Sequence, residues 1–188
     1  MALSCSLNKN LLKGSNCDYV LQSVTEIYLA NNTDAVVNTA SGDTCGQSVT
    51  GVTLGEVDGV KNEWFRIQPA KNTASFTDVL NVTDSGNKYR THSLSFSVSG
   101  KYDGEMACVI DGLSLGSYLA IAVFASGDAV LLGSATAGLE ATVVTNTGSA
   151  TATEASGISV EMSADLTATA LPIDKDKLSS IVSAQAGA

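Results

Sequence analysis

The sequence contains little of what catalysis and metal binding usually require. It has one histidine, His92, and no C-x-x-C pair occurs among its cysteines, which are Cys5, Cys17, Cys45 and Cys108. Because a zinc site needs clustered ligands of these types, we expect no metal and no other cofactor. We interpret the cysteines as buried free thiols of a protein made in a reducing cytosol, with a Cys5–Cys17 disulfide as the alternative.

Charge is also scarce, and what there is has mostly one sign. Charged residues make up 15% of the chain, and 10 Lys and Arg against 19 Asp and Glu give a net charge of −9. Tight nucleic-acid binding needs clustered Lys and Arg, so it is disfavoured, whereas a channel that repels DNA and lets it slide is compatible. The abundant Ser, Thr, Gly, Ala and Asn indicate uncharged polar surfaces, which suit a subunit covered by its neighbours or an extracellular β-protein.

Targeting and membrane signals are missing as well. No positively charged segment precedes an apolar one at the N-terminus, so no secretory signal is visible. The most apolar stretch, 118–133, is interrupted by Ser126-Gly127-Asp128 and is too short to span a bilayer. With 44% hydrophobic residues in 188, the sequence predicts one folded domain over 1–188 and no membrane partner.

Short alternating apolar runs between Gly, Asn, Asp and Ser clusters predict a mainly β fold of antiparallel strands, a sandwich or barrel. An early strand is expected at 26–29 and another at 64–68, where Pro69 ends it because proline cannot donate to a ladder. Between them, 32–55 has little periodicity. We interpret it as a loop, either an insertion or a stacking loop.

The clearest predicted element is a long hairpin. Its arms, 75–82 and 88–99, flank Asp84-Ser85-Gly86-Asn87, whose residue types tolerate the positive φ angles of tight turns. In the second arm, apolar Leu94, Phe96 and Val98 alternate with serines, which predicts one packed face and one hydroxyl face.

The second half continues this pattern around one short helix. Apolar spacings of three and four from Met106 to Leu113 predict that helix. Strands are expected at 118–124 and 129–133, as a central hairpin, and at 139–146 and 158–166. The tail, 174–188, is either a short helix or a flexible arm.

Motifs that could carry chemistry have simpler interpretations. Ser114 lies in a G-x-S-x-G pattern, but the nucleophile elbow needs a base, and His92 precedes the serine instead of following it. Asp174-Lys175-Asp176 lacks the glycine and closing glutamate of a calcium loop. The sequons at Asn31 and Asn81 are common chance matches. The sequence therefore predicts a protein that is not an enzyme.

A resemblance to a known family rests on the order of several segments. Cys5, Cys17 and the run Glu26–Asn31 open the chain, and the second half adds Leu119–Val123, Leu131–Gly133, Gly138–Glu140 and Gly157–Glu161. In this order, over residues 1–173, the chain resembles the tail tube proteins (major tail protein family) of Bacteroidetes phages. The 32–55 stretch has no equivalent in that family.

The resemblance implies a structural virion protein of the phage tail, assembled in the host cytoplasm. Such subunits form hexameric rings that stack into a tube, contact other tail proteins and let DNA pass during ejection without sequence-specific binding. It places inter-ring contacts at the hairpin tip and in the terminal segments. The predicted contact residues of the tip are Asp84, Ser85, Gly86, Asn87 and Lys88.

Two other functions stay open at this point. A secreted or surface-displayed β-sandwich binding module, an adhesin or a carbohydrate-binding domain, also suits low charge and abundant hydroxyls. It usually needs exposed aromatics, whereas here aromatics are 5% and the one tryptophan, Trp64, lies in a predicted strand. Another tail or connector protein of the same fold is a further alternative, because a fold does not fix a function.

Overall fold

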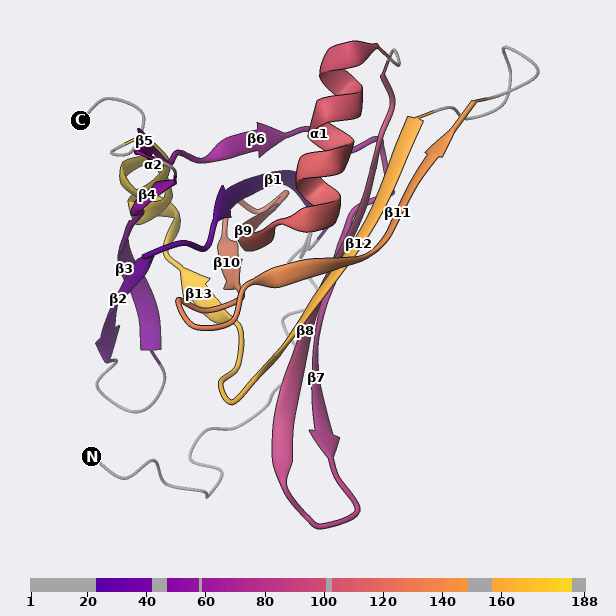
Figure 1. Ribbon diagram of the computed structural model, residues 1–188. Helices are drawn as coiled ribbons and strands as arrows, with labels where there is room; N and C mark the ends of the chain where they lie inside the picture. The colour runs from indigo at the N-terminus through magenta and orange to yellow at the C-terminus, as the bar shows by residue number, and fades with distance from the viewer. Residues whose placement is uncertain (1–22, 42–46, 58, 101–102, 149–156, 184–188) are drawn as a thin grey trace, which may run out of the picture.

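Strands make up most of the fold in the computed structural model, which describes residues 23–41, 47–57, 59–100, 103–148 and 157–183 (Figure 1). One large, mixed and mostly antiparallel sheet of 11 strands is accompanied by a 2-stranded sheet and by helices α1 and α2. The mainly β prediction is confirmed. Within the described residues the large sheet is not closed into a barrel, so the barrel alternative is wrong for the single chain.

The elements follow one another in a simple order. The first are β1 (Val24–Asn31), β2 (Val36–Ser41), β3 (Gln47–Thr53), β4 (Glu56–Val57), β5 (Val60–Lys61), β6 (Phe65–Ile67), β7 (Ser75–Val82) and β8 (Lys88–Val98). The others are α1 (Gly104–Leu115), β9 (Ser117–Phe124), β10 (Ala129–Leu132), β11 (Leu139–Thr147), β12 (Gly157–Leu166), β13 (Leu171–Ile173) and α2 (Lys175–Ser183).

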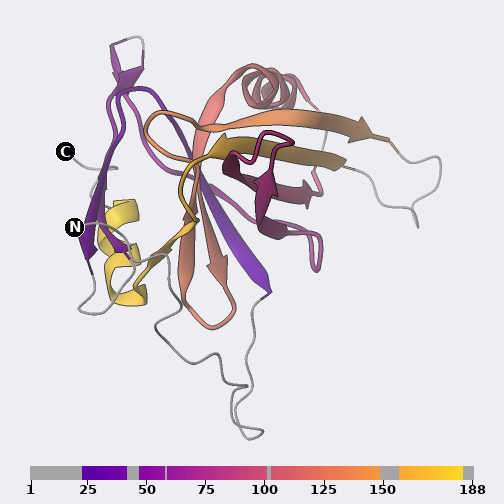
Figure 2. The ribbon, with the colours of Figure 1, turned by 90° about the horizontal axis from the view of Figure 1, so that it is seen from below.

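The large sheet divides into two parts. The central sheet runs β6–β1–β9–β10–β13–β3–β2, and the arm sheet runs β11–β12–β8–β7. They join where Leu139 and Glu140 of β11 pair with Tyr118 and Ser117 of β9. The pairings are antiparallel except for β13 with β3. In Figure 2 the long β7–β8 hairpin and the β11–β12 pair lie on one side of the central strands.

The core lies on both faces of the central sheet. Alternate β9 side chains point to opposite faces, so Leu119, Ile121 and Val123 pack in a cluster with β3 and α2. Ala120 and Ala122 pack in a second cluster with β8 and β12 of the arm sheet. Because both of its faces are buried, β9 has the continuous apolar sequence typical of a central strand.

Most predicted elements are confirmed. The early strand, the strand before Pro69, both hairpins, the helix near residue 104 and the strands at 139–146 and 158–166 all form. The tail forms α2, whose Ile181 is buried against the central sheet. Of the apolar helix positions, Met106, Ile110 and Leu113 pack on the core, but Val109 is 49% exposed.

The prediction of a loop over 32–55 is wrong, because β2 and β3 form an antiparallel pair there. Val49 and Val52 of β3 are both buried although they are three residues apart, a spacing that does not fit a regular strand. The pairing register shifts between Asn38 and Thr39, which leaves an extra residue, Thr50, in β3. This bulge puts both valines on the core side and removes the alternation that would have indicated a strand.

Candidate interaction surfaces

The β7–β8 hairpin extends beyond the rest of the described chain, and its turn is the far end (Figure 1). The Thr83 N–H donates to the Asn87 carbonyl at 2.9 Å, and Gly86 has a φ of 83°, which glycine adopts without steric cost. The predicted inter-ring residues, Asp84 to Lys88, are all exposed at this tip. Their position suits contact with another molecule, and the contact itself stays a prediction.

A polar cluster anchors the base of the hairpin. Arg90 Nε donates to Asp78 Oδ1 at 2.6 Å, and Asp78 Oδ2 accepts the Ala170 N–H at 3.0 Å. His92 is 1% exposed and uses both ring nitrogens. Its Nδ1 accepts the Gly133 N–H at 3.2 Å, so Nε2 carries the proton and donates to the Ala168 carbonyl at 3.1 Å. The sole histidine is therefore a satisfied structural residue that ties β8 to two neighbouring turns.

The protonation states of this cluster follow from its surroundings. Burial lowers the pKa of His92 below its ordinary value, and this outweighs the opposing attraction of Asp78. For Asp78, partial burial alone would raise the pKa, but the hydrogen bonds from Arg90 and the Ala170 N–H and the nearby positive charge lower it. At neutral pH the cluster therefore holds a carboxylate, a guanidinium and a neutral imidazole.

The arm sheet has an outer face, on the side away from the core, that is covered by hydroxyl groups. The pairing register places on it the following residues: Ser75, Thr77, Val79 and Asn81 of β7; Tyr89, Thr91, Ser93, Ser95 and Ser97 of β8; Ser159, Glu161, Ser163 and Asp165 of β12; and Glu140, Val143 and Thr145 of β11. Many of these side chains bond one another, for example Ser75 with Ser95 at 2.8 Å and Ser97 with Ser159 at 2.7 Å. The predicted hydroxyl face of β8 is thus part of a wider surface.

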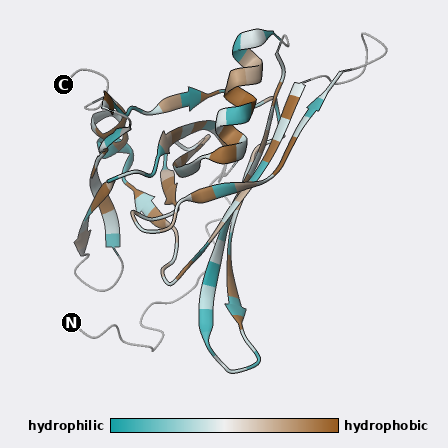
Figure 3. Cartoon of the chain, in the orientation of Figure 1, coloured by the Kyte–Doolittle hydropathy of each residue, from teal (hydrophilic) through white to brown (hydrophobic). Residues whose placement is uncertain are grey.

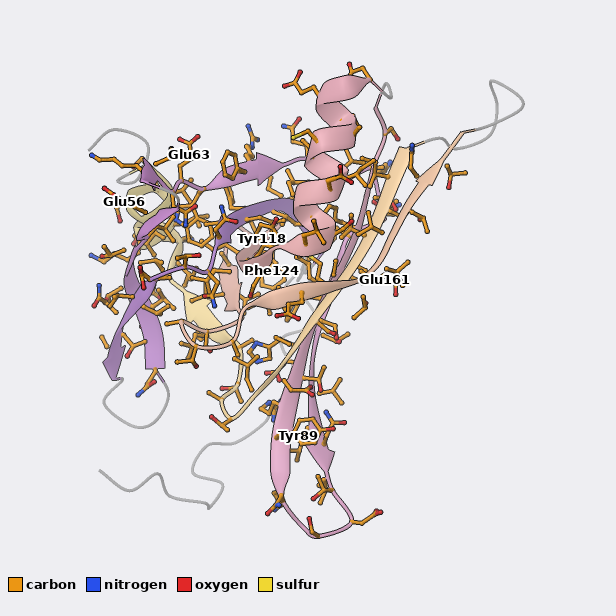
Figure 4. The ribbon with its side chains drawn as sticks, viewed as in Figure 1. Glu56, Glu63, Tyr89, Tyr118, Phe124 and Glu161 are labelled. Carbon is orange, nitrogen blue, oxygen red and sulfur yellow. The ribbon has the colours of Figure 1, made fainter. Side chains whose placement is uncertain are left out.

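The charges on this outer face have one sign. Glu140, Glu161 and Asp165 are its only ionisable carboxylates, and no Lys or Arg occupies an outer-face position in the described strands of the arm sheet. Figure 4 shows Glu161 on the arm, away from the central strands, and Figure 3 shows hydrophilic residues along much of β8. Such a face would repel a phosphate backbone weakly and offer it no cationic partner.

β7 forms an open edge of the sheet, because among the described strands it pairs only with β8. The Thr83–Asn87 bond shows which β7 N–H groups face β8, since hydrogen-bonded and non-hydrogen-bonded pairs alternate along an antiparallel ladder. By this alternation the N–H groups of Phe76, Asp78, Leu80 and Val82 point away from β8. At the opposite edge of the arm sheet, β11 pairs with β9 only at Leu139 and Glu140.

The remaining candidate residues form no catalytic arrangement. Ser114 lies in the last turn of α1, where its hydroxyl donates to the Ile110 carbonyl, while the ring nitrogens of His92 are bonded to Ala168 and Gly133. Trp64 is 8% exposed and offers no stacking surface for a sugar. No group of three or more His, Cys, Asp or Glu residues in the described part of the chain could hold a metal ion.

The cysteine prediction is wrong for the one cysteine that the structure describes. Cys108 is exposed on α1, where a buried thiol was expected. It faces away from the core because Met106, Ile110 and Leu113 occupy the packed side of the helix. Cys5, Cys17 and Cys45 lie outside the described residues, as does the predicted contact role of the N-terminal segment.

Comparison with known proteins gives no family for this chain. No family model, no curated protein and no solved structure matches it. In the described residues, neither helix has the length and apolar character needed to cross a bilayer. The surfaces of the fold are therefore the basis for inferring a function.

Proposed function

We propose that this protein is a ring-forming structural subunit of a phage tail tube, whose rings stack around a channel for DNA. The observation that carries the proposal is the outer face of the arm sheet, which combines serine and threonine hydroxyls with three carboxylates and no basic residue. A channel wall of this kind lets a polyanion slide, because it provides no cations that would hold phosphates.

The open edges of the arm sheet could join neighbouring subunits into a ring by strand pairing. Exposed strand edges favour pairing with another chain, and the backbone N–H groups of Leu80 and Val82 point away from β8. In the proposed ring, β7 of one subunit continues the sheet through β11 of the next, and hexameric closure leaves the outer faces lining the lumen. The arm sheet packed on the central sheet then corresponds to the sandwich of the tail-tube family, with the central sheet on the outside of the ring.

The test is to image the purified protein by negative-stain electron microscopy and to measure its mass by light scattering. Rings or tubes with a central hole support the proposal. A strict monomer at every concentration and salt tested contradicts it and favours the binding-module alternative, even though burial of Trp64 removes the obvious sugar-stacking residue.

A sharper variant tests the edge itself. Leu80→Pro removes one outward N–H without breaking a β7–β8 ladder bond, because proline is tolerated at the open edge of a sheet. We expect this variant to stay folded and fail to form rings, while Leu80→Ala, which keeps the N–H, still forms them. Equal ring formation by both variants would contradict pairing through β7.

A further inference from the structure

An apolar groove lies at the end of the molecule opposite the hairpin tip. It has a volume of about 540 Å³ and lies between α1, β6 and the ends of β8 and β12. Its apolar lining residues are Ile67, Phe96, Val98, Met106, Val109, Leu113 and Ile158. Because Val98 is the last residue of β8 and Lys88 is the first, the groove and the hairpin tip lie at the two ends of one strand (Figure 1).

The distal part of the hairpin carries exposed apolar side chains of its own. Leu80 is 52% exposed and Val82 is 58% exposed, and both lie on the same side of β7. Their partners across the ladder are Arg90 and Lys88. Arg90 is already bonded to Asp78, so Lys88 is the cation that this end presents. The tip therefore combines apolar groups with a positive charge.

The groove offers a complementary charge. α1 contains Glu105 and Asp111 and has no Lys or Arg. Glu105 precedes Val109 by four residues, so the carboxylate and the exposed valine lie on the same side of the helix. Among the described residues that line the groove, the one basic residue, Arg66, is engaged with Glu26 in an ion pair. An incoming Lys88 would thus meet an acidic helix and not a competing cation.

From these relations we infer that the distal hairpin of one copy, through Leu80, Val82 and Lys88, docks in the α1 groove of a second copy of this chain. The inference rests on the proposed function. It adds that, between two stacked rings, the surface contacted by the hairpin tip is the α1 groove. Donor and acceptor surfaces lie at opposite ends of the same molecule, so the contact is heterologous and repeats without closing on itself, which is the geometry that builds a filament.

An introduced pair of cysteines provides a direct test, because Val109 lines the groove and is 49% exposed, whereas the native Cys108 lies on another side of α1. A Val82→Cys, Val109→Cys variant in which Cys108 is replaced by Ser is treated with a short bismaleimide, and the joined peptides are mapped by mass spectrometry. We expect residue 82 of one copy to be joined to residue 109 of another, and the product to disappear when Val109 is left unchanged. Ser126→Cys, in the β9–β10 turn, replaces Val82→Cys as the placement control and should give no product with residue 109.

Two substitutions on α1 provide a second test that needs no crosslinking reagent. Val109 lines the groove, whereas Leu115, 88% exposed on the same helix, does not. We expect Val109→Asp to give single rings and Leu115→Asp to give tubes of wild-type length in electron micrographs. Rings without the crosslink between residues 82 and 109, or tubes of full length from Val109→Asp, overturn the docking and leave the ring proposal intact. A protein with neither assembly nor crosslink overturns both.

Discussion

Arg90 Nε lies 2.6 Å from Asp78 Oδ1, and this pair connects the two strands of the projecting hairpin at the point where it leaves the body of the protein. The same carboxylate accepts the Ala170 N–H through Oδ2, so it also ties the hairpin to the turn after β12. Since both side chains are partly buried, at 27% and 16% exposure, removing one leaves the other without its partner in a poorly hydrated position.

Replacing this carboxylate should therefore weaken the fold. We expect Asp78→Ala to lower the free energy of unfolding by about 1–3 kcal/mol, as measured by urea denaturation. The matched control is Glu63→Gln, which changes an exposed carboxylate and should be nearly neutral. Equal stability of both variants would show that the cluster does not hold the hairpin.

The buried neutral imidazole makes stability depend on pH. The pKa of His92 is below its ordinary value of 6.5 in the folded state, so below about pH 6.5 the unfolded chain takes up a proton that the folded chain does not. Stability should fall as pH decreases from 6.5 toward the lower folded pKa. The His92→Gln variant should lack this component, which urea denaturation of both proteins between about pH 7.5 and pH 5.5 would reveal. An unchanged pH profile in the variant would contradict the assignment.

Asp78 contributes in a different pH range. Its folded pKa lies below the ordinary value of 3.8, so its contribution is complete above that value and is lost as pH falls through the folded pKa. The loss from Asp78 thus begins at a lower pH than that from His92, and the two variants separate the two contributions.

Glycine geometry gives a further prediction. Gly157, at the start of β12, has a φ of 146°, and a Cβ there would lie 2.2 Å from the Val98 carbonyl oxygen. Gly127, in the β9–β10 turn, has a φ of 89° with nothing within 4 Å. Gly127→Ala should cost about 1–2 kcal/mol for backbone strain alone. Gly157→Ala should cost clearly more, and thermal melting of the two variants compares them. Equal melting temperatures would contradict the close backbone approach.

Some of this architecture follows from the sequence and some does not. The long hairpin and β9 were predictable. The regular alternation in 88–98 indicates a strand buried on one face, and the continuous apolar run in 118–124 indicates a strand buried on both faces. β2 and β3 were not, because the bulge at Thr50 breaks the period. β13 is three residues long and contains Pro172, which usually argues against a strand.

The candidate surfaces, too, could be predicted from the sequence only in part. The hydroxyl face of β8 follows from its alternating serines, but the wider outer face depends on the register with β7, β12 and β11, which are distant in sequence. The exposure of Cys108 and Val109 could not be predicted, because apolar spacing shows which side of a helix is packed but not how many of the neighbouring positions are buried. The Asp78–Arg90–His92 cluster gave no sequence signal beyond polar residues at alternate hairpin positions.

The charge of the outer face should control how DNA behaves in the assembled protein. Glu161→Lys places a cation on that face, and we expect tubes of this variant to retain double-stranded DNA at low salt and release it as salt rises. Ser126→Lys, in the β9–β10 turn, adds the same charge elsewhere and should not give retention inside the tube. Equal DNA retention by the two variants in a cosedimentation assay would contradict the lumen assignment.

In the proposed assembly, copies of this chain form a ring with the outer face of the arm sheet toward the lumen. Electron cryo-microscopy of the assembled protein would locate that face. We expect a closed ring in which β7 of each subunit pairs with the next subunit and Ser95, Glu161 and Ser163 line the central hole. A ring with these residues on its outside, or a preparation that contains only monomers, would rule out this arrangement.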